Sequence, residues 1–91
     1  MNTPVLDLLQ DPSHWTQGTF AKSQSGKEVN PKSPIAVCWC LRGAIAKCYT
    51  GFESEAIEKL NTALPHNVSM IHFNDTSTHK EIVALLEKAQ I

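Results

Sequence analysis

Apolar residues recur at helical spacing near the start, in the middle and at the end of the chain. Near the start, Thr3 and Pro4 precede an apolar group that stops before Asp11 and Pro12. A threonine followed by proline is typical of a helix start, and a later proline disfavours helical geometry in the residue before it. This pattern predicts a short helix from Pro4 to about Gln10.

The strongest predicted element is a central helix from Pro34 to Thr50. Ser33 is a suitable N-cap, and Gly51 stands where a glycine commonly closes a helix. Apolar residues between them recur at intervals of three and four, which indicates one buried stripe. The stripe consists of Ile35, Cys38, Leu41, Ile45 and Cys48. Gly43 would cost about 1 kcal/mol relative to alanine in an exposed helix, so we expect another backbone to pass close to it.

Two further helices are predicted in the second half of the chain. From about Ser54 to Leu64, apolar residues define one face and charged residues the other, and Pro65 ends the pattern. Thr78 and Glu81 then form an S/T-x-x-E capping box, and the apolar residues after them continue at helical spacing. The last helix is therefore predicted to begin at Thr78 and to be amphipathic.

Strand signals are weaker and fall in two places. Between Trp15 and Asn30, apolar residues flank the polar turn Ser23 to Gly26, whose glycine can supply the positive φ that such a turn needs. Val68 to Phe73 alternates well enough for a strand. Together these elements predict an α+β fold in which one domain, residues 1–91, packs two to three further helices and a short hairpin or strand around the central apolar helix.

Composition is that of a folded protein with one hydrophobic core. The 91 residues are 42% apolar and 19% charged, which is close to the average for soluble domains. The N-terminal segment lacks the basic flank and apolar stretch of a signal peptide, and no apolar run is long enough to cross a membrane. We therefore expect a cytoplasmic protein with no membrane partner, and three reduced cysteines rather than disulfides.

Charge is almost balanced overall, with a formal net charge of -1. Residues 21–50 carry five basic side chains against one acid, whereas residues 51–91 carry six acids against three lysines. Contact with a phosphate backbone usually needs denser clusters of Lys and Arg, so nucleic acid is a disfavoured partner. The pattern is typical of a solvated mixed surface, and a charged contact patch for a protein partner is the alternative.

Several short motifs also follow one another in a recognisable order. They are Trp15 with Gln17 and Gly18, then Gly26, then Cys40 and Leu41 with Gly43 and Ala44, and finally Phe73, Asn74 and Asp75 leading to Thr78. In this order the motifs resemble an uncharacterised domain family of unknown function, found in bacteria, especially actinobacteria, and in phages. The resemblance implies an order of elements and no activity. In a phage or mobile element it would fit an accessory protein that modulates a host system.

The first candidate for chemistry pairs a cysteine with a histidine. Cys38 or Cys40, with His72 as base and Asn74 or Asp75 to orient it, would suit a minimal cysteine hydrolase or transferase. Against it, both cysteines lie inside the predicted helix, where the effect of the helix dipole on a thiolate has faded. Free cysteines are also among the most buried residues, so core packing is the favoured interpretation and catalysis the alternative.

Metal binding is disfavoured by spacing. On a helix Cys38 and Cys40 would point roughly 200° apart, and the four histidines lack the paired spacing of structural zinc sites. We expect neither a metal nor a cofactor.

Asn74 and Asp75 are first of all turn residues, since both side chains can bond their own backbone. The alternative is a polar network with Trp15, Gln17 and the start of the last helix, lining a cleft.

Trp39 lies off the buried stripe of the central helix. Its ring either meets a second layer of the core or is exposed beside Arg42 as an interface anchor.

These residues favour a non-enzymatic module that binds a protein partner, with Trp15, Gln17, Trp39, Arg42, Asn74 and Asp75 as binding candidates. A homodimer joined through the exposed face of the central or last helix is a further hypothesis.

Overall fold

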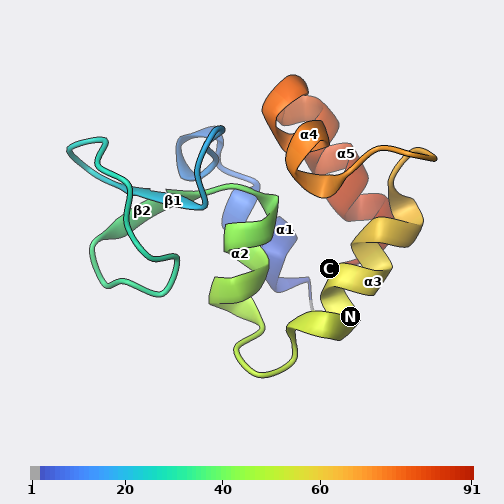
Figure 1. Cartoon of the computed structure of the whole chain (residues 1–91), viewed down its shortest axis with the longest axis horizontal. Coiled ribbons are helices and arrows are strands. Elements are labelled where there is room, and N and C mark those ends of the chain that lie inside the picture. The colour runs from blue at the N-terminus through green and yellow to red at the C-terminus, as the bar shows by residue number, and fades with distance from the viewer. Residues whose placement is uncertain (1–2) are drawn as a thin grey trace.

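The chain folds into helices on one side and a small sheet on the other. In the computed structural model, which describes residues 3–91, five α-helices, one short 3-10 helix and two strands follow one another (Figure 1). This arrangement confirms the α+β class. The extent of the domain, residues 1–91, stays a prediction.

Three predicted helices are present with nearly the predicted bounds. They are α1 (Pro4–Leu9), α3 (Glu53–Ala63) and α5 (His79–Ala89). The capping box of α5 is confirmed, because Thr78 Oγ1 accepts a hydrogen bond from the Glu81 amide at 3.3 Å and the Glu81 carboxylate accepts one from the Thr78 amide at 2.9 Å. Between α1 and the sheet, Pro12–His14 form the 3-10 helix.

The predicted central helix is wrong in its first half. Residues Ala36–Trp39 form strand β2, and helix α2 covers only Leu41–Cys48. A short apolar run that contains Ile35 and Val37 suits a strand as well as a helix, and both of these side chains are exposed rather than part of a buried stripe. The presence of an antiparallel partner strand decides between the two conformations.

That partner is β1 (Ala21–Ser23), whose first residue pairs with Trp39 of β2. The turn predicted after β1 is confirmed, since Gly26 has a φ of 84° and its amide donates to the carbonyl of Ser23 at 2.9 Å. Beyond this turn the returning chain forms only a single bridge to β1, at Glu28. The hairpin predicted between residues 15 and 30 is therefore local, and the main pairing joins β1 to β2.

The strand predicted from Val68 to Phe73 is also wrong, because Met70–Thr76 form helix α4. Ser69 caps this helix, and its hydroxyl accepts a hydrogen bond from the backbone amide of His72 at 3.1 Å. The two buried side chains of α4, Met70 and Asn74, stand one helical turn apart. Over six residues the alternation of apolar and polar positions could not reveal this helical face.

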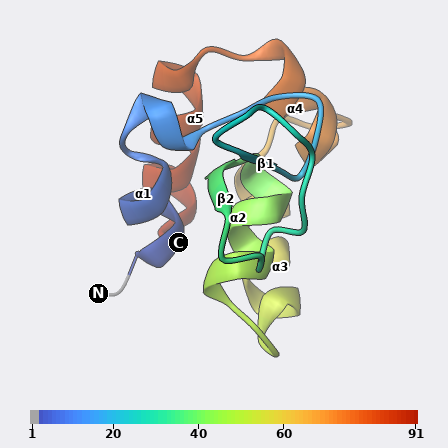
Figure 2. The same ribbon diagram turned by 90° about the vertical axis from the view of Figure 1, so that its left-hand side faces the viewer.

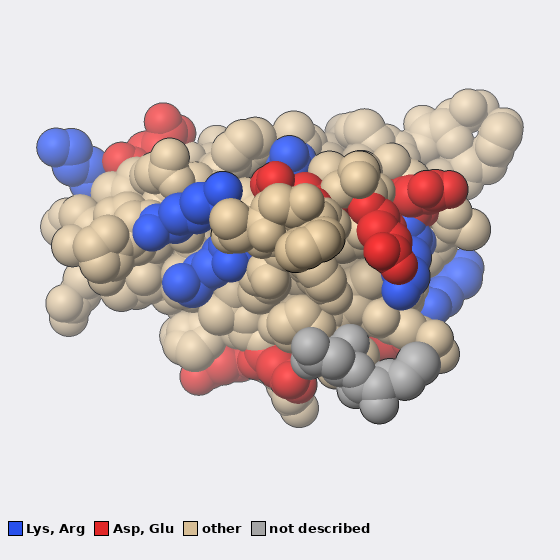
Figure 3. Space-filling model, turned by 90° about the horizontal axis from the view of Figure 1, so that it is seen from below, with Lys and Arg blue, Asp and Glu red and all other residues tan. Residues whose placement is uncertain are grey.

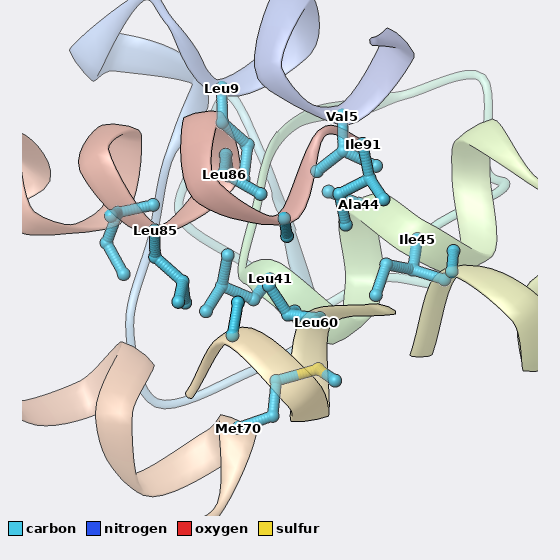
Figure 4. Packing of buried hydrophobic residues seen from close by; sticks show 14 of the residues in the cluster. Val5, Leu9, Leu41, Ala44, Ile45, Leu60, Met70, Leu85, Leu86 and Ile91 are labelled. Carbon is cyan, nitrogen blue, oxygen red and sulfur yellow. The ribbon is translucent and has the colours of Figure 1, made fainter. Parts of the chain in front are cut away.

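The hydrophobic core lies between α1, α2, α3 and α5, and Figure 4 shows side chains from these helices pointing toward one another. Leu9, Leu41, Leu60 and Leu86 are fully buried there. Burying one such side chain stabilises a fold by about 1.5 to 3 kcal/mol. At the edge of the core α1 meets residue 91, where the Val5 amide donates to the Ile91 carbonyl at 2.8 Å.

The hairpin covers the side of α2 that faces away from α3 (Figures 1 and 2). Contact is closest at Gly43, where an added Cβ atom would stand 2.0 Å from the carbonyl oxygen of Phe20. The same carbonyl accepts a hydrogen bond from the Cys40 amide at 3.2 Å. The close backbone approach expected at Gly43 is therefore confirmed, and it comes from the segment that leads into β1.

Candidate functional site

Asn74 is the centre of a polar network that joins α4 to the hairpin and to α2. Its side chain is 1% exposed. The Oδ1 atom accepts hydrogen bonds from Trp15 Nε1 at 2.8 Å and from the Leu41 amide at 3.0 Å. The Nδ2 atom donates to the Thr16 carbonyl at 3.0 Å and to Asp75 Oδ1 at 3.1 Å. Every donor and acceptor of the amide is thus in use, which fixes its orientation.

Three further hydrogen bonds from the loop before β1 extend this network. Gln17 Nε2 donates to the carbonyls of Asn74 at 3.0 Å and Ser77 at 3.1 Å. The Gly18 amide donates to Asp75 Oδ1 at 2.9 Å. The hydrogen bond from Gly18, and after it the one from Asn74, lowers the pKa of the Asp75 carboxyl, so this group is ionised at neutral pH.

The structure therefore brings together four of the predicted binding residues, Trp15, Gln17, Asn74 and Asp75. Asn74 and Asp75 lie in helix α4, whereas the sequence pattern had suggested a turn after a strand. Trp15 and Gln17 bond to Asn74 from the loop before β1. The contacts explain why motifs from distant parts of the chain belong together. A role of these residues in binding stays a prediction.

The other two predicted binding residues lie in different surroundings. Trp39 is buried, its Nε1 donates to the Pro31 carbonyl at 2.9 Å, and Lys47 Nζ lies 5.3 Å from the ring centroid. It belongs to a second layer of the core and is not an exposed anchor. Arg42 is half-buried and lies 3.5 Å from the carboxylate of Glu53.

Cys40 is the N-cap of α2, so the expectation that it lies inside a helix is wrong. Its Sγ accepts a hydrogen bond from the Gly43 amide at 3.3 Å. Burial nevertheless raises the pKa of the Cys40 thiol, and the negative charge of Asp75 acts in the same direction, against the hydrogen bond from Gly43. These effects favour the protonated thiol over the thiolate.

The remaining members of the predicted thiol site are dispersed. Cys38 lies in β2, half-buried, with its Sγ 4.0 Å from the Lys22 carbonyl. The side chain of His72 is exposed on α4, and within residues 3–91 no hydrogen bond joins its imidazole to a thiol. A cysteine hydrolase or transferase stays an untested alternative.

Metal-binding side chains do not gather in the part of the chain that is described. Across residues 3–91, no three His, Cys, Asp or Glu side chains come close enough to hold a metal ion. Over the same range no helix has the length and apolar content needed to cross a membrane.

A cleft of about 720 Å³ opens beside the polar network. Residues 18–20 and 28–31, the start of α2 and the outer side of α4 line it. Phe20 and Ile71 contribute apolar side chains that are 45% and 52% exposed. The charged side chains of the cleft are Glu28, Arg42 and Asp75. The cleft is thus partly apolar and carries acids and a base at separate points.

Sequence reasoning missed Phe20, Glu28 and Ile71. Each of them is an exposed residue in a segment whose conformation the local pattern does not predict, and only the packing of distant segments places them at one cleft. The face shown in Figure 3 does not point to a second site, since acidic and basic side chains are interspersed over it.

Comparison with known proteins identifies a family. Residues 4–90 match the model of a family of unknown function, DUF6197. No curated protein and no solved structure matches the chain.

Proposed function

The chain belongs to this family of unknown function, and on that premise we propose that it is a non-enzymatic interaction module whose cleft binds a partner protein. The observation that carries the proposal is the exposure of Phe20 and Ile71 in one cleft. Large apolar side chains that stay exposed in a concave, polar-rimmed site are typical of binding surfaces.

The polar network supports this function by holding the cleft in one shape. Asn74 and Asp75 fix α4 to the loop that carries Phe20, through Trp15 and Gly18. A site whose walls are already ordered loses less conformational entropy on binding. An accessory role in a phage or mobile element, modulating a host system, is the biological setting that the family resemblance adds.

A site-specific photocrosslinker tests the proposal. Phe20 is replaced by p-benzoylphenylalanine in the full chain expressed in its native host, and a second variant carries the same group at Phe52. Phe52 is the matched control because it is 73% exposed and lies outside the cleft, at the start of α3. We expect one defined adduct at position 20 and none of that mass at position 52.

A third variant asks whether the adduct depends on the cleft itself. Ile71→Arg, combined with the crosslinker at position 20, replaces the second exposed apolar side chain of the cleft by a charged one and should abolish the adduct. Circular dichroism should show that this variant stays folded. The proposal is wrong if positions 20 and 52 give the same adducts, if Ile71→Arg leaves the adduct unchanged, or if position 20 gives none. An adduct of twice the domain mass would instead identify a homodimer.

A further inference from the structure

The charged side chains that line the cleft indicate which kind of ligand it binds. Resting on the proposed function, we infer that the cleft binds a protein segment that presents a Lys or Arg side chain next to an apolar side chain. The cation would lie between the carboxylates of Glu28 and Asp75, and the apolar group would lie against Phe20 and Ile71.

The two carboxylates are held by consecutive residues of the same loop. The Gly18 amide donates to Asp75 Oδ1 at 2.9 Å, and Thr19 Oγ1 donates to Glu28 Oε1 at 2.6 Å. Because Gly18 and Thr19 are consecutive, these contacts anchor both acids to one loop.

Each acid keeps one oxygen available for a ligand. Within residues 3–91, no hydrogen bond or ion pair engages Asp75 Oδ2 or Glu28 Oε2. A carboxylate accepts hydrogen bonds at both oxygens, and an ammonium or guanidinium group is its strongest donor.

The single basic side chain of the cleft does not balance these acids. Arg42 lies 3.5 Å from the carboxylate of Glu53, so its charge is already partly compensated outside the pair formed by Glu28 and Asp75. Among the side chains that line the cleft, the two acids therefore outweigh the one base, and this local excess of negative charge favours a cationic ligand.

The apolar half of the ligand follows from the two exposed hydrophobic side chains. Phe20 belongs to the same loop as Gly18 and Thr19, and Ile71 projects from α4, one turn before Asp75. A cation and an adjoining apolar group can therefore contact the carboxylates and these side chains at the same time. An acidic segment would meet the same apolar surface with charge repulsion.

Three probe peptides test this inference on the purified domain. N-acetyl-Leu-Lys-amide, N-acetyl-Leu-Gln-amide and N-acetyl-Leu-Glu-amide are titrated while backbone amide shifts are recorded by NMR. We expect saturable shifts at Gly18, Thr19 and Ile71, with the lysine peptide binding about fivefold more tightly than the glutamate peptide, as for a partly exposed ion pair.

A salt titration and a matched pair of variants test whether the preference for the lysine peptide comes from the acids of the cleft. The preference should vanish at about 1 M salt, where the Debye length falls to about 3 Å. Glu28→Gln should reduce the preference for lysine by about half or more, since it removes one of two charges. Glu58→Gln, an exposed acid of α3 outside the cleft, should leave the preference unchanged.

The outcomes separate the inference from the proposed function. Equal or stronger binding of the glutamate peptide at the cleft overturns the cationic ligand but leaves the cleft as a binding site. Shifts confined to other surfaces, or no shifts with any peptide, also overturn the inference. Failure of the crosslinker at position 20, in contrast, overturns the proposed function itself.

Discussion

The apolar core and the polar network around Asn74 hold the fold together by different means. In the core, many fully buried side chains from α1, α2, α3 and α5 each contribute a similar amount of stability. In the network, one amide makes four hydrogen bonds, three of which join α4 to the loop before β1 and to α2. The stability of the helical part is thus spread over many residues, whereas one side chain carries several of the polar contacts that attach the loop before β1.

The largest expected effect is in the core. Leu86→Ala should lower the free energy of unfolding by about 3 to 4 kcal/mol, because it removes a fully buried side chain and leaves a cavity. Urea unfolding followed by circular dichroism and by tryptophan fluorescence should give one coincident transition, since the whole domain loses stability. Ile35→Ala, an exposed aliphatic control, should change the free energy by about 0.5 kcal/mol or less.

Asn74→Ala should come next, at about 2 to 3 kcal/mol. It leaves Trp15 Nε1 and the buried Leu41 amide without their acceptor, and an unpaired buried donor costs about 1 to 3 kcal/mol. Amide exchange should speed up more in the hairpin than in α5. Asn61→Ala, in an exposed position of α3, should have almost no effect. Equal acceleration in the hairpin and α5 would contradict a separate role for the network.

Gly43→Ala examines the contact between α2 and the hairpin. The added Cβ would lie 2.0 Å from the Phe20 carbonyl oxygen, so the backbone must move. Such overpacking costs about 1 to 3 kcal/mol, and the better helix propensity of alanine offsets up to about 1 kcal/mol of it. We expect a net loss of about 1 to 2 kcal/mol by urea unfolding. If the variant is as stable as the native protein, the segment at Phe20 can move away from α2 without loss of stability, and the prediction is wrong.

The smallest expected effect concerns Asp75 and pH. Because its pKa is lowered in the fold, this carboxylate stabilises the native state at pH values above the ordinary aspartate pKa of about 3.9. That contribution is lost as pH falls through the lowered value. Asp75→Asn should therefore show a shallower loss of stability below about pH 4 in thermal unfolding. Asp11, whose pKa the Ser13 amide lowers, should keep part of the slope.

The sequence predicts the helical part of the molecule better than the hairpin or the site. Helix α3 has a stop signal at Pro65 and helix α5 a start signal in its capping box, and each has one apolar face, so local pattern suffices. Residues 34–40 and 68–73 have patterns that fit a helix or a strand, and their conformation depends on β1 and on the cap at Ser69. The site depends on contacts between Trp15 and Asn74, which are 59 positions apart, and no periodicity connects them.

The hydrogen bond between the Val5 amide and the Ile91 carbonyl has a consequence for how the chain can be rearranged. With its first helix and last residue in contact, the backbone forms an almost closed ring. A short linker between residues 3 and 91 and a new opening in the exposed turn at Gly26 should yield a circular permutant with the same core. In such a permutant β1 would become a terminal strand.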